Sequence, residues 1–333
     1  MRNAIVPLIC AILLLPFTAK AETVRQHLAG ANHTLTAYYN ATTQPGDAVF
    51  VRLVLTPEQT AGKPIAARTT GSVRLYAADN NTKPLCTADL YILNRDGTDT
   101  QNDVLLSGLP LSSFLQAGLY SLVVQYRAFG ADEAQLVLPV TVIAKDFVSE
   151  TIPLDNRNTS IKTNTSSART DQIRRLDAIL GARNAESIYN TTAFVPPTPA
   201  TRRTSFFADR RVYAYTGGGS STSLHYGIDY GVPTGSEVRA CARGKVVMAE
   251  DRVTTGWSVC IEHLPGLYSL YYHMSEIRVA VGDLLDAGDL VGLSGATGLA
   301  TGPHLHWEVR LNMEAVSPDF FVSDFTFEEA ARN

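Results

Sequence analysis

Short apolar runs alternate with polar residues through residues 22–145, and this period of two predicts β-strands rather than helices. The predicted strands are Val49–Leu55, Val73–Tyr76, Ala88–Leu93, Leu119–Tyr126 and Leu136–Ile143. Several short strands separated by turn residues are typical of a β-sandwich, which we expect over residues 22–145. Pro139 lies inside the last run, so that strand should lie at a sheet edge or carry a bulge, because proline cannot donate to a sheet.

The same strand pattern returns in residues 205–317, now with many glycines between the runs. The predicted strands here are Val238–Val247, Ser258–His263, Tyr268–His273 and His304–Leu311. Leu264-Pro265-Gly266 has the composition of a tight turn between two of them. We therefore predict a mostly β protein with two β domains and treat residues 318–333 as a C-terminal tail.

Residues 146–204 differ in composition and are predicted to connect the two β domains. The stretch Asn156–Ser167 is polar and rich in Asn, Thr and Ser, which favours a loop or linker. Arg169–Leu180 places its apolar residues at helical spacing, so a short helix should follow. Pro196-Pro197-Thr198-Pro199 predicts a stiff, extended chain.

The first residues have the features of a secretory signal peptide. Arg2 supplies a positive charge, Ile5–Phe17 is almost entirely apolar, and Ala19-Lys20-Ala21 fits the cleavage pattern of small residues. The apolar run is shorter than the roughly 20 residues that a membrane anchor needs. We therefore expect residues 1–21 to be removed, leaving an exported protein of the periplasm or cell envelope with no stable membrane span.

Composition and charge restrict the partners. The chain has 45% hydrophobic and 18% charged residues, which is enough apolar material for two cores. Its formal net charge is −4, and it contains no run of basic residues. Nucleic acid is therefore not expected as a partner, because binding to phosphates needs a concentrated positive surface.

Export would place Cys86, Cys241 and Cys260 in a compartment that permits disulfides. If Val238–Val247 and Ser258–His263 are neighbouring strands, Cys241 and Cys260 alternate away from the apolar residues and share a face. They would then form a disulfide, with Cys86 single. Two separate free thiols are an equal alternative, because one parity argument does not determine strand order.

The histidines carry the strongest chemical signal: of seven in the chain, five lie between positions 225 and 306. His225 precedes Asp229 by four residues, in a Gly-rich context that favours a strand meeting a turn over a helix. His304 and His306 are two apart in a predicted strand, so both should point to the same side. Zinc accepts imidazole nitrogen and carboxylate oxygen, and a catalytic zinc keeps one position open. His273 is a further candidate in this cluster.

The other three histidines lack such partners. His27 and His33 are isolated in the first β domain, and His263 ends a predicted strand with no ligand residue beside it in sequence. An isolated histidine lacks the convergent groups that a site requires. We expect these three to be structural or solvated.

An ordered set of motifs resembles the lysostaphin-type (LytM-like) zinc peptidases. The motifs are His225-Tyr226-Gly227-Ile228-Asp229, then Ala240 with Gly244-Lys245-Val246-Val247, then Tyr272-His273, and finally Gly298–Trp307. Gly118–Leu122 also resembles the start of a late strand of an immunoglobulin-like domain, as in the subgroup with such an N-terminal domain. One motif departs: Ser205–Arg210 has Ala208 where the family often has glycine.

The resemblance implies an antiparallel β-sheet peptidase domain with a groove over one zinc ion. It implies that His225, Asp229 and His306 are zinc ligands and that His304 and His273 are the catalytic pair. The implied activity is hydrolysis of peptidoglycan stem or cross-bridge peptides, with cell-division or wall-remodelling proteins as candidate partners. The alternative is a non-catalytic wall-binding regulator or activator of a wall amidase, as degenerate members of the family are; here no ligand is lost.

Overall fold

The computed structural model describes residues 23–30, 32–58, 68–78, 82–93, 102–322 and 327. The predicted signal peptide and most of the predicted tail lie outside these residues. The fold is mostly β and its sheets are mainly antiparallel, as predicted. Among the described residues, no helix has the length and apolar character needed to cross a membrane.

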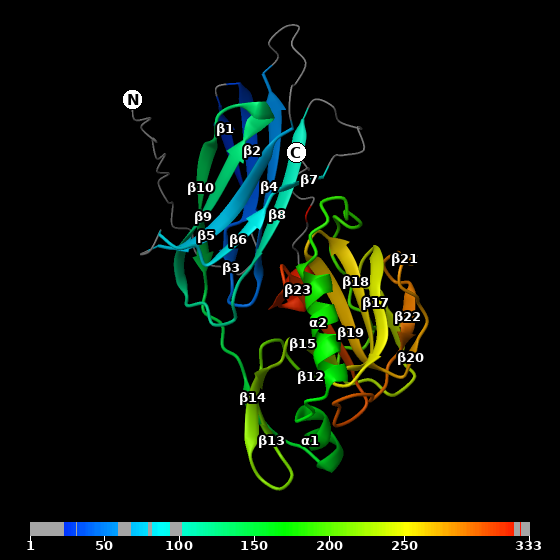
Figure 1. The fold of residues 1–333 in the computed structure, drawn as a ribbon. Coiled ribbons are helices and arrows are strands. Elements are labelled where there is room, and N and C mark those ends of the chain that lie inside the picture. Colours follow the sequence, from blue (N-terminus) through cyan, green and yellow to red (C-terminus); the bar gives the residue numbers. More distant parts are fainter. Residues whose placement is uncertain are drawn as a thin grey trace.

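The first β region consists of two five-stranded sheets that enclose one apolar core (Figure 1). One sheet has the order β1-β2-β4-β8-β7, with bounds Thr23–Ala29, His33–Asn40, Ala48–Pro57, Asp103–Pro110 and Tyr91–Ile92. The other has the order β3-β10-β9-β5-β6, with bounds Thr42–Thr43, Ala134–Val142, Gly118–Arg127, Thr70–Ala77 and Cys86–Asp89. A single 3₁₀ turn, Ala128–Gly130, follows β9. The immunoglobulin-like assignment of this region stays a prediction.

Two details of this region bear on the predicted strands. The run Ala88–Leu93 is broken at Leu90 into β6 and β7, which belong to different sheets. In β10, the side facing away from β9 pairs with β3 only at Thr141 and Val142. Pro139 therefore lies along an edge, where its missing N–H breaks no hydrogen bond of a second neighbouring strand, as predicted.

The connector contains more structure than its composition indicates. Its first strand, β11 (Ser149–Pro153), pairs in parallel with β13 (Arg210–Ala214), which pairs with β14 (Ser220–Leu224). The prediction of a loop over Asn156–Ser167 was wrong for its first part, which forms helix α1 (Asn156–Lys162). The carboxylate of Asp155 accepts from the backbone N–H of Asn158 and caps this helix, a signal that outweighs its polar composition.

The second connector helix agrees with the prediction. Helix α2 spans Ser167–Gly181 and is capped by the Ser166 side chain. Its residues Leu176, Ile179 and Leu180 pack on one face of the large sheet of the second β region, over a cluster formed by Met248, Cys260, Tyr268, Leu270 and Tyr272. Figure 1 shows α2 lying across the strands β17 to β19.

The second β region is built on one large sheet with the order β12-β15-β23-β19-β18-β17-β21, and β24 pairs with β23. The bounds are Arg203–Ser205, Gly227–Tyr230, Leu305–Leu311, Leu267–Met274, Gly256–Leu264, Gly244–Arg252, Leu284–Leu285 and, for β24, Glu314–Val316. A small sheet has the order β16-β22-β20, with bounds Glu237–Arg239, Leu290–Leu293 and Glu276–Ile277. The turn between β18 and β19 is the predicted one, with Gly266 at a φ of 79°.

The predicted strand Val238–Val247 was wrong. Its residues divide between β16 and β17, which lie in different sheets, and Ala240, Cys241 and Ala242 are buried in the connection. The parity argument for a disulfide therefore fails. Cys241 joins the core on one side of the large sheet, Cys260 lies beneath α2 on the other, and both are free thiols.

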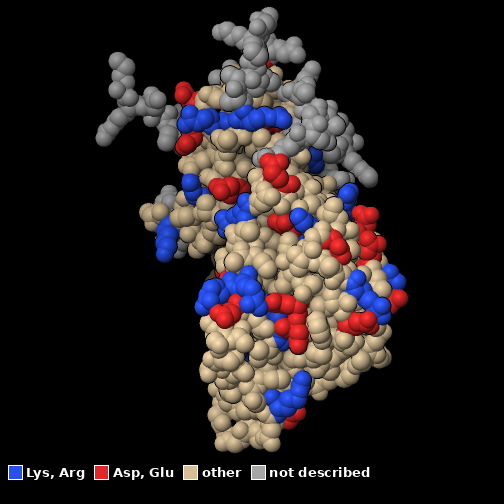
Figure 2. All heavy atoms as spheres, turned by 45° about the vertical axis from the view of Figure 1, so that its right-hand side comes forward, with Lys and Arg blue, Asp and Glu red and all other residues tan. Residues whose placement is uncertain are grey.

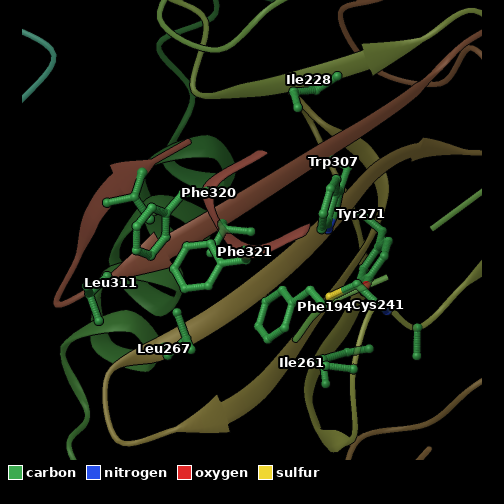
Figure 3. Packing of buried hydrophobic residues seen from close by; sticks show 14 of the residues in the cluster. Phe194, Ile228, Cys241, Ile261, Leu267, Tyr271, Trp307, Leu311, Phe320 and Phe321 are labelled. Carbon is green, nitrogen blue, oxygen red and sulfur yellow. The ribbon is translucent and has the colours of Figure 1, made fainter. Parts of the chain in front are cut away.

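The core of the second region lies on the sheet face opposite to α2. Figure 3 shows Trp307 of β23 and Tyr271 of β19 beside Cys241 and Phe194 in this core. The same cluster takes in Phe50 of β4, whose ring lies 5.0–6.3 Å from the rings of Phe320, Phe321 and Phe327. Phe320 and Phe321 belong to the short helix α3 (Pro318–Val322). The two β regions are thus joined by an aromatic contact as well as by the connector.

Candidate metal centre

Two neighbouring strands and the short connection before them bring the predicted ligands together. His225 follows β14, and Asp229 lies in β15, directly opposite His306 of β23. On the other side of β23, Tyr272 of β19 is opposite His306. The Tyr272 ring stacks on that of His306, with the centroids 5.2 Å apart and the planes at 10°. Leu305 and Trp307 of β23 alternate with His306 and with His304, which directly precedes the strand. Both are fully buried in the core, so His304 and His306 face the other side, as predicted.

The polar atoms of the three residues converge on one point. His225 Nε2, Asp229 Oδ1 and His306 Nδ1 lie 2.9–3.0 Å from one another. A tetrahedral zinc with bonds of about 2.0–2.2 Å holds its ligand atoms about 3.3–3.6 Å apart. The cluster is therefore close to the spacing that a zinc ion requires, and a small outward relaxation of each side chain would reach it.

Hydrogen bonds on the outer side of each imidazole orient the inner nitrogen. The carbonyl oxygen of Phe206 lies 2.8 Å from His225 Nδ1 and can only accept, so Nδ1 carries the hydrogen and Nε2 presents a lone pair. Glu308 Oε2 lies 3.3 Å from His306 Nε2 and leaves Nδ1 as the inward lone pair. Two lone pairs and a carboxylate facing one point fit a cation, and outer partners of this kind are usual for metal-bound histidine.

Charges around the cluster agree with this. Burial alone would raise the pKa of Asp229, but its short contacts with the His225 and His306 imidazoles hold it well below its usual value. Burial lowers the pKa of His225. Burial also opposes the charge on His306, yet its bonds to Asp229 and Glu308 raise its pKa to about 9. His306 thus takes up a proton that a bound cation would displace.

Arg211 supports the carboxylate from outside. Its Nη2 lies 3.2 Å from Asp229 Oδ2 and its Nε lies 3.0 Å from Glu150 Oε1. The Oδ1 atom of Asp229 is the one that faces the two imidazoles. Arg211 therefore engages the oxygen that the cluster does not use and holds the carboxylate in its orientation.

His304 and His273 form a second pair beside the cluster. Their ring centroids are 4.7 Å apart, and His304 Nε2 lies 3.7 Å from Asp229 Oδ1. His304 Nδ1 donates to the carbonyl of Gly302 and His273 Nδ1 to that of Thr297. With Nδ1 as the donor, the neutral form of each ring has Nε2 as its proton acceptor. His273 also has a φ of 60°, a left-handed conformation that costs an L-residue about 1–2 kcal/mol and that tends to mark functional positions.

The turn that carries the departing motif residue touches a predicted ligand. Ala208 has a φ of 63°, the conformation for which glycine is the usual choice, and its N–H donates to the carbonyl of His225 over 2.7 Å. In the same turn, Phe206 supplies the carbonyl that orients the His225 ring. Alanine thus keeps a glycine-type turn that supports His225.

The other histidines lie away from the cluster. His263 is fully buried; its Nδ1 donates to the Arg243 carbonyl and its Nε2 lies 2.8 Å from Ser269 Oγ. Burial lowers its pKa to about 4. His27 and His33 lie in β1 and β2 of the first β region. All three occupy the kind of position that their isolation in the sequence indicates.

A groove of about 650 Å³ runs over the cluster, and the connector forms one of its walls. The groove is lined on this side by residues 150–153 of β11, by Leu154 directly after it and by Lys162 of α1. The loop 299–304 lines it opposite them. A buried hydrogen bond from Asn158 to the carbonyl of Ala300 ties the two walls together. The segment predicted only to join two domains therefore shapes the space in front of the histidines.

Several groups of the site were not predicted. Glu308 lies two residues after His306 on the same strand, so the period of two could have identified it. Arg211 and Glu150 meet through the parallel pairing of β11 with β13, for which the sequence offers no local signal.

Comparison with known proteins identifies the segment that contains this cluster. Residues 223–318 match the model of the family described as Peptidase family M23. This segment is therefore similar to an M23 peptidase domain. Over 95 residues it is 42% identical to the DD-carboxypeptidase/endopeptidase Mpg of Neisseria meningitidis serogroup B, covering 28% of this chain and 22% of that protein.

Other relatives of this segment extend this picture. The chain is 34% identical over 127 residues to the peptidoglycan DD-endopeptidase ShyA of Vibrio cholerae, covering 38% of this chain and 29% of ShyA. It thus spans only about a quarter of the length of these curated relatives. A crystal structure of an M23 peptidase from Pseudomonas aeruginosa shares the fold, with a TM-score of 0.53, 20% identity and coverage of 85% of this chain and 96% of that one.

Proposed function

We propose that this chain is an exported zinc endopeptidase that hydrolyses peptide cross-links of bacterial peptidoglycan. His225, Asp229 and His306 hold one zinc ion in this proposal. The observation that carries it is the convergence of their three inward atoms within 3.0 Å, inside a segment similar to an M23 peptidase domain and beneath a groove. Three protein ligands with one position left open is the pattern of catalytic zinc rather than structural zinc.

Zinc bound there would supply a Lewis acid that acidifies water and polarises the scissile carbonyl. His304 accepts the proton of the attacking water, because its Nε2 is an acceptor 3.7 Å from Asp229 Oδ1. His273 offers a second acceptor that orients the same water. His304 then returns the proton to the leaving amine, as a general base that becomes a general acid.

The substrate follows from the relatives and from the groove. ShyA is named as an endopeptidase of peptidoglycan and Mpg as a DD-carboxypeptidase/endopeptidase. A groove of about 650 Å³ over the cluster has room for a short peptide segment. The rival function, a non-catalytic regulator, is disfavoured because all five groups of a hydrolytic site are present in this chain.

Two variants test the proposal on purified protein. His306→Ala should lose most of the roughly one zinc per chain, whereas His304→Ala should keep the metal and lose hydrolysis by about two to four orders of magnitude. Mass spectrometry of muropeptides after digestion, with a chelator control, identifies the bond cleaved. Full zinc occupancy in His306→Ala would refute the ligand set. Zinc-loaded wild-type protein that releases no muropeptides would refute the peptidase.

A further inference from the structure

One cation on the groove wall is held in place without an acidic partner. Lys162 is the last residue of α1 and lines the groove, half-buried. Its Nζ lies 4.3 Å from the centre of the Tyr213 ring. Among the residues that the structure describes, no carboxylate forms an ion pair with it. The aromatic ring therefore positions the Lys162 ammonium group, whose N–H groups stay available to a ligand in the groove.

The charged neighbours of Lys162 repel it. Burial lowers its pKa, and the nearby guanidinium groups of Arg169 and Arg211 lower it further. A cation placed near two others in a partly desolvated position costs free energy in the free protein. An anion that enters the groove would relieve this repulsion.

The carboxylates of the groove are already engaged. Glu150 pairs with Arg211 at 3.0 Å, and Asp229 pairs with Arg211 while facing the histidines. Glu308 is held between His306 and Arg310. None of these carboxylates neutralises Lys162, so an anion for it has to come from a ligand.

Lys162 is also linked to the metal centre through two side chains. Arg211 Nη1 is 3.5 Å from the Tyr213 hydroxyl, and its Nη2 is 3.2 Å from Asp229. One tyrosine and one guanidinium group therefore separate Lys162 from the ligand carboxylate. A peptide in the groove with its scissile bond at the metal would pass Lys162 within a few residues.

We propose that Lys162 binds a free carboxylate of the substrate peptide and so selects acidic stem peptides over uncharged cross-bridges. This inference rests on the proposed function, because it assumes that a peptide occupies the groove. On the face shown in Figure 2, positive and negative side chains lie interspersed, so this face offers no surface of a single charge that would itself select an acidic peptide. Arg202 and Arg211 also line the groove, but Arg211 is paired with Glu150 and Asp229, and only Lys162 is positioned over an aromatic ring among the groove cations that the structure describes.

Binding tests the inference separately from turnover. Two labelled peptides are compared that differ at one group near the scissile bond, a free carboxylate in one and a carboxamide in the other. Fluorescence anisotropy is measured on the full chain carrying His304→Ala, so that the peptides are not consumed. The variants added to this background are Lys162→Met, which keeps the stem over Tyr213, and Lys83→Met as a control at an exposed lysine outside the groove.

The carboxylate peptide should bind about 10-fold more tightly than its amide twin, since a hydrogen bond to a charged group is stronger than one to a neutral group and the half-exposure of Lys162 reduces the gain. Lys162→Met should abolish this preference and leave the affinity for the amide unchanged, while Lys83→Met should retain it. Equal affinities for the two peptides, or a preference that survives Lys162→Met, would overturn the inference. A preference with no hydrolysis by the wild-type chain would support Lys162 and count against the peptidase alone.

Discussion

Replacing Glu308 by glutamine tests whether a group outside the cluster controls the metal. Glu308 is 2% exposed and accepts from His306 Nε2 over 3.3 Å. Glutamine keeps the shape but offers a neutral acceptor. A charged acceptor contributes about 1.5–3 kcal/mol against about 0.5–1.5 for a neutral one, so the loss is about 1–1.5 kcal/mol. This corresponds to a zinc affinity lower by about 10-fold, at the lower end of the effects known for such outer partners.

The assay is competition for zinc with a chromophoric chelator at neutral pH. Glu308 also pairs with Arg310, so the variant loses stability as well, and its unfolding is measured separately. Glu262→Gln is the matched control, because Glu262 is a buried carboxylate of β18 in the same large sheet and does not line the groove. An unchanged zinc affinity in Glu308→Gln, or an equal loss in Glu262→Gln, would show that the His306–Glu308 contact does not tune the metal.

Three further predictions concern backbone strain, pH and thiols. His273→Gly and His273→Ala should both lose hydrolysis, but the glycine variant should be more stable than the alanine variant by about 0.5–1 kcal/mol. Glycine relieves the left-handed strain at φ 60°, and the larger entropy of its unfolded chain cancels part of that gain. Equal denaturant midpoints for the two variants would contradict this. The pKa of His263 falls from 6.5 to about 4 on folding, so the unfolded chain binds more protons between these values and stability falls as pH drops through this window. At pH 5 the loss is about 2 kcal/mol relative to pH 7.5, to be measured by urea unfolding, and His263→Gln should lack it. Unfolded, unreduced protein without residues 1–21 should show three reactive thiols, from Cys86, Cys241 and Cys260, and a count of one would indicate the disulfide after all.

Local sequence patterns determined much of the second β region, because they depend on the geometry of single strands and turns. Residues two apart in a strand share a face, which is why His304 and His306 could be assigned to one side and Trp307 to the core. The turn at Gly266 and the helix before Gly181 follow from equally local rules. The histidine-rich motifs carried the resemblance to a peptidase family, and the family match falls on the same segment.

Tertiary structure decided everything that depends on which strands are neighbours. The period of two is the same for every strand, so it could not reveal that Val238–Val247 divides between two sheets or that Cys241 and Cys260 lie on opposite sides of one. It also could not show that the connector pairs with β13 and faces the cluster. Glu150 and Lys162 enter the site by this route, from a segment with no motif, because the parallel pairing of β11 with β13 brings the connector to the groove.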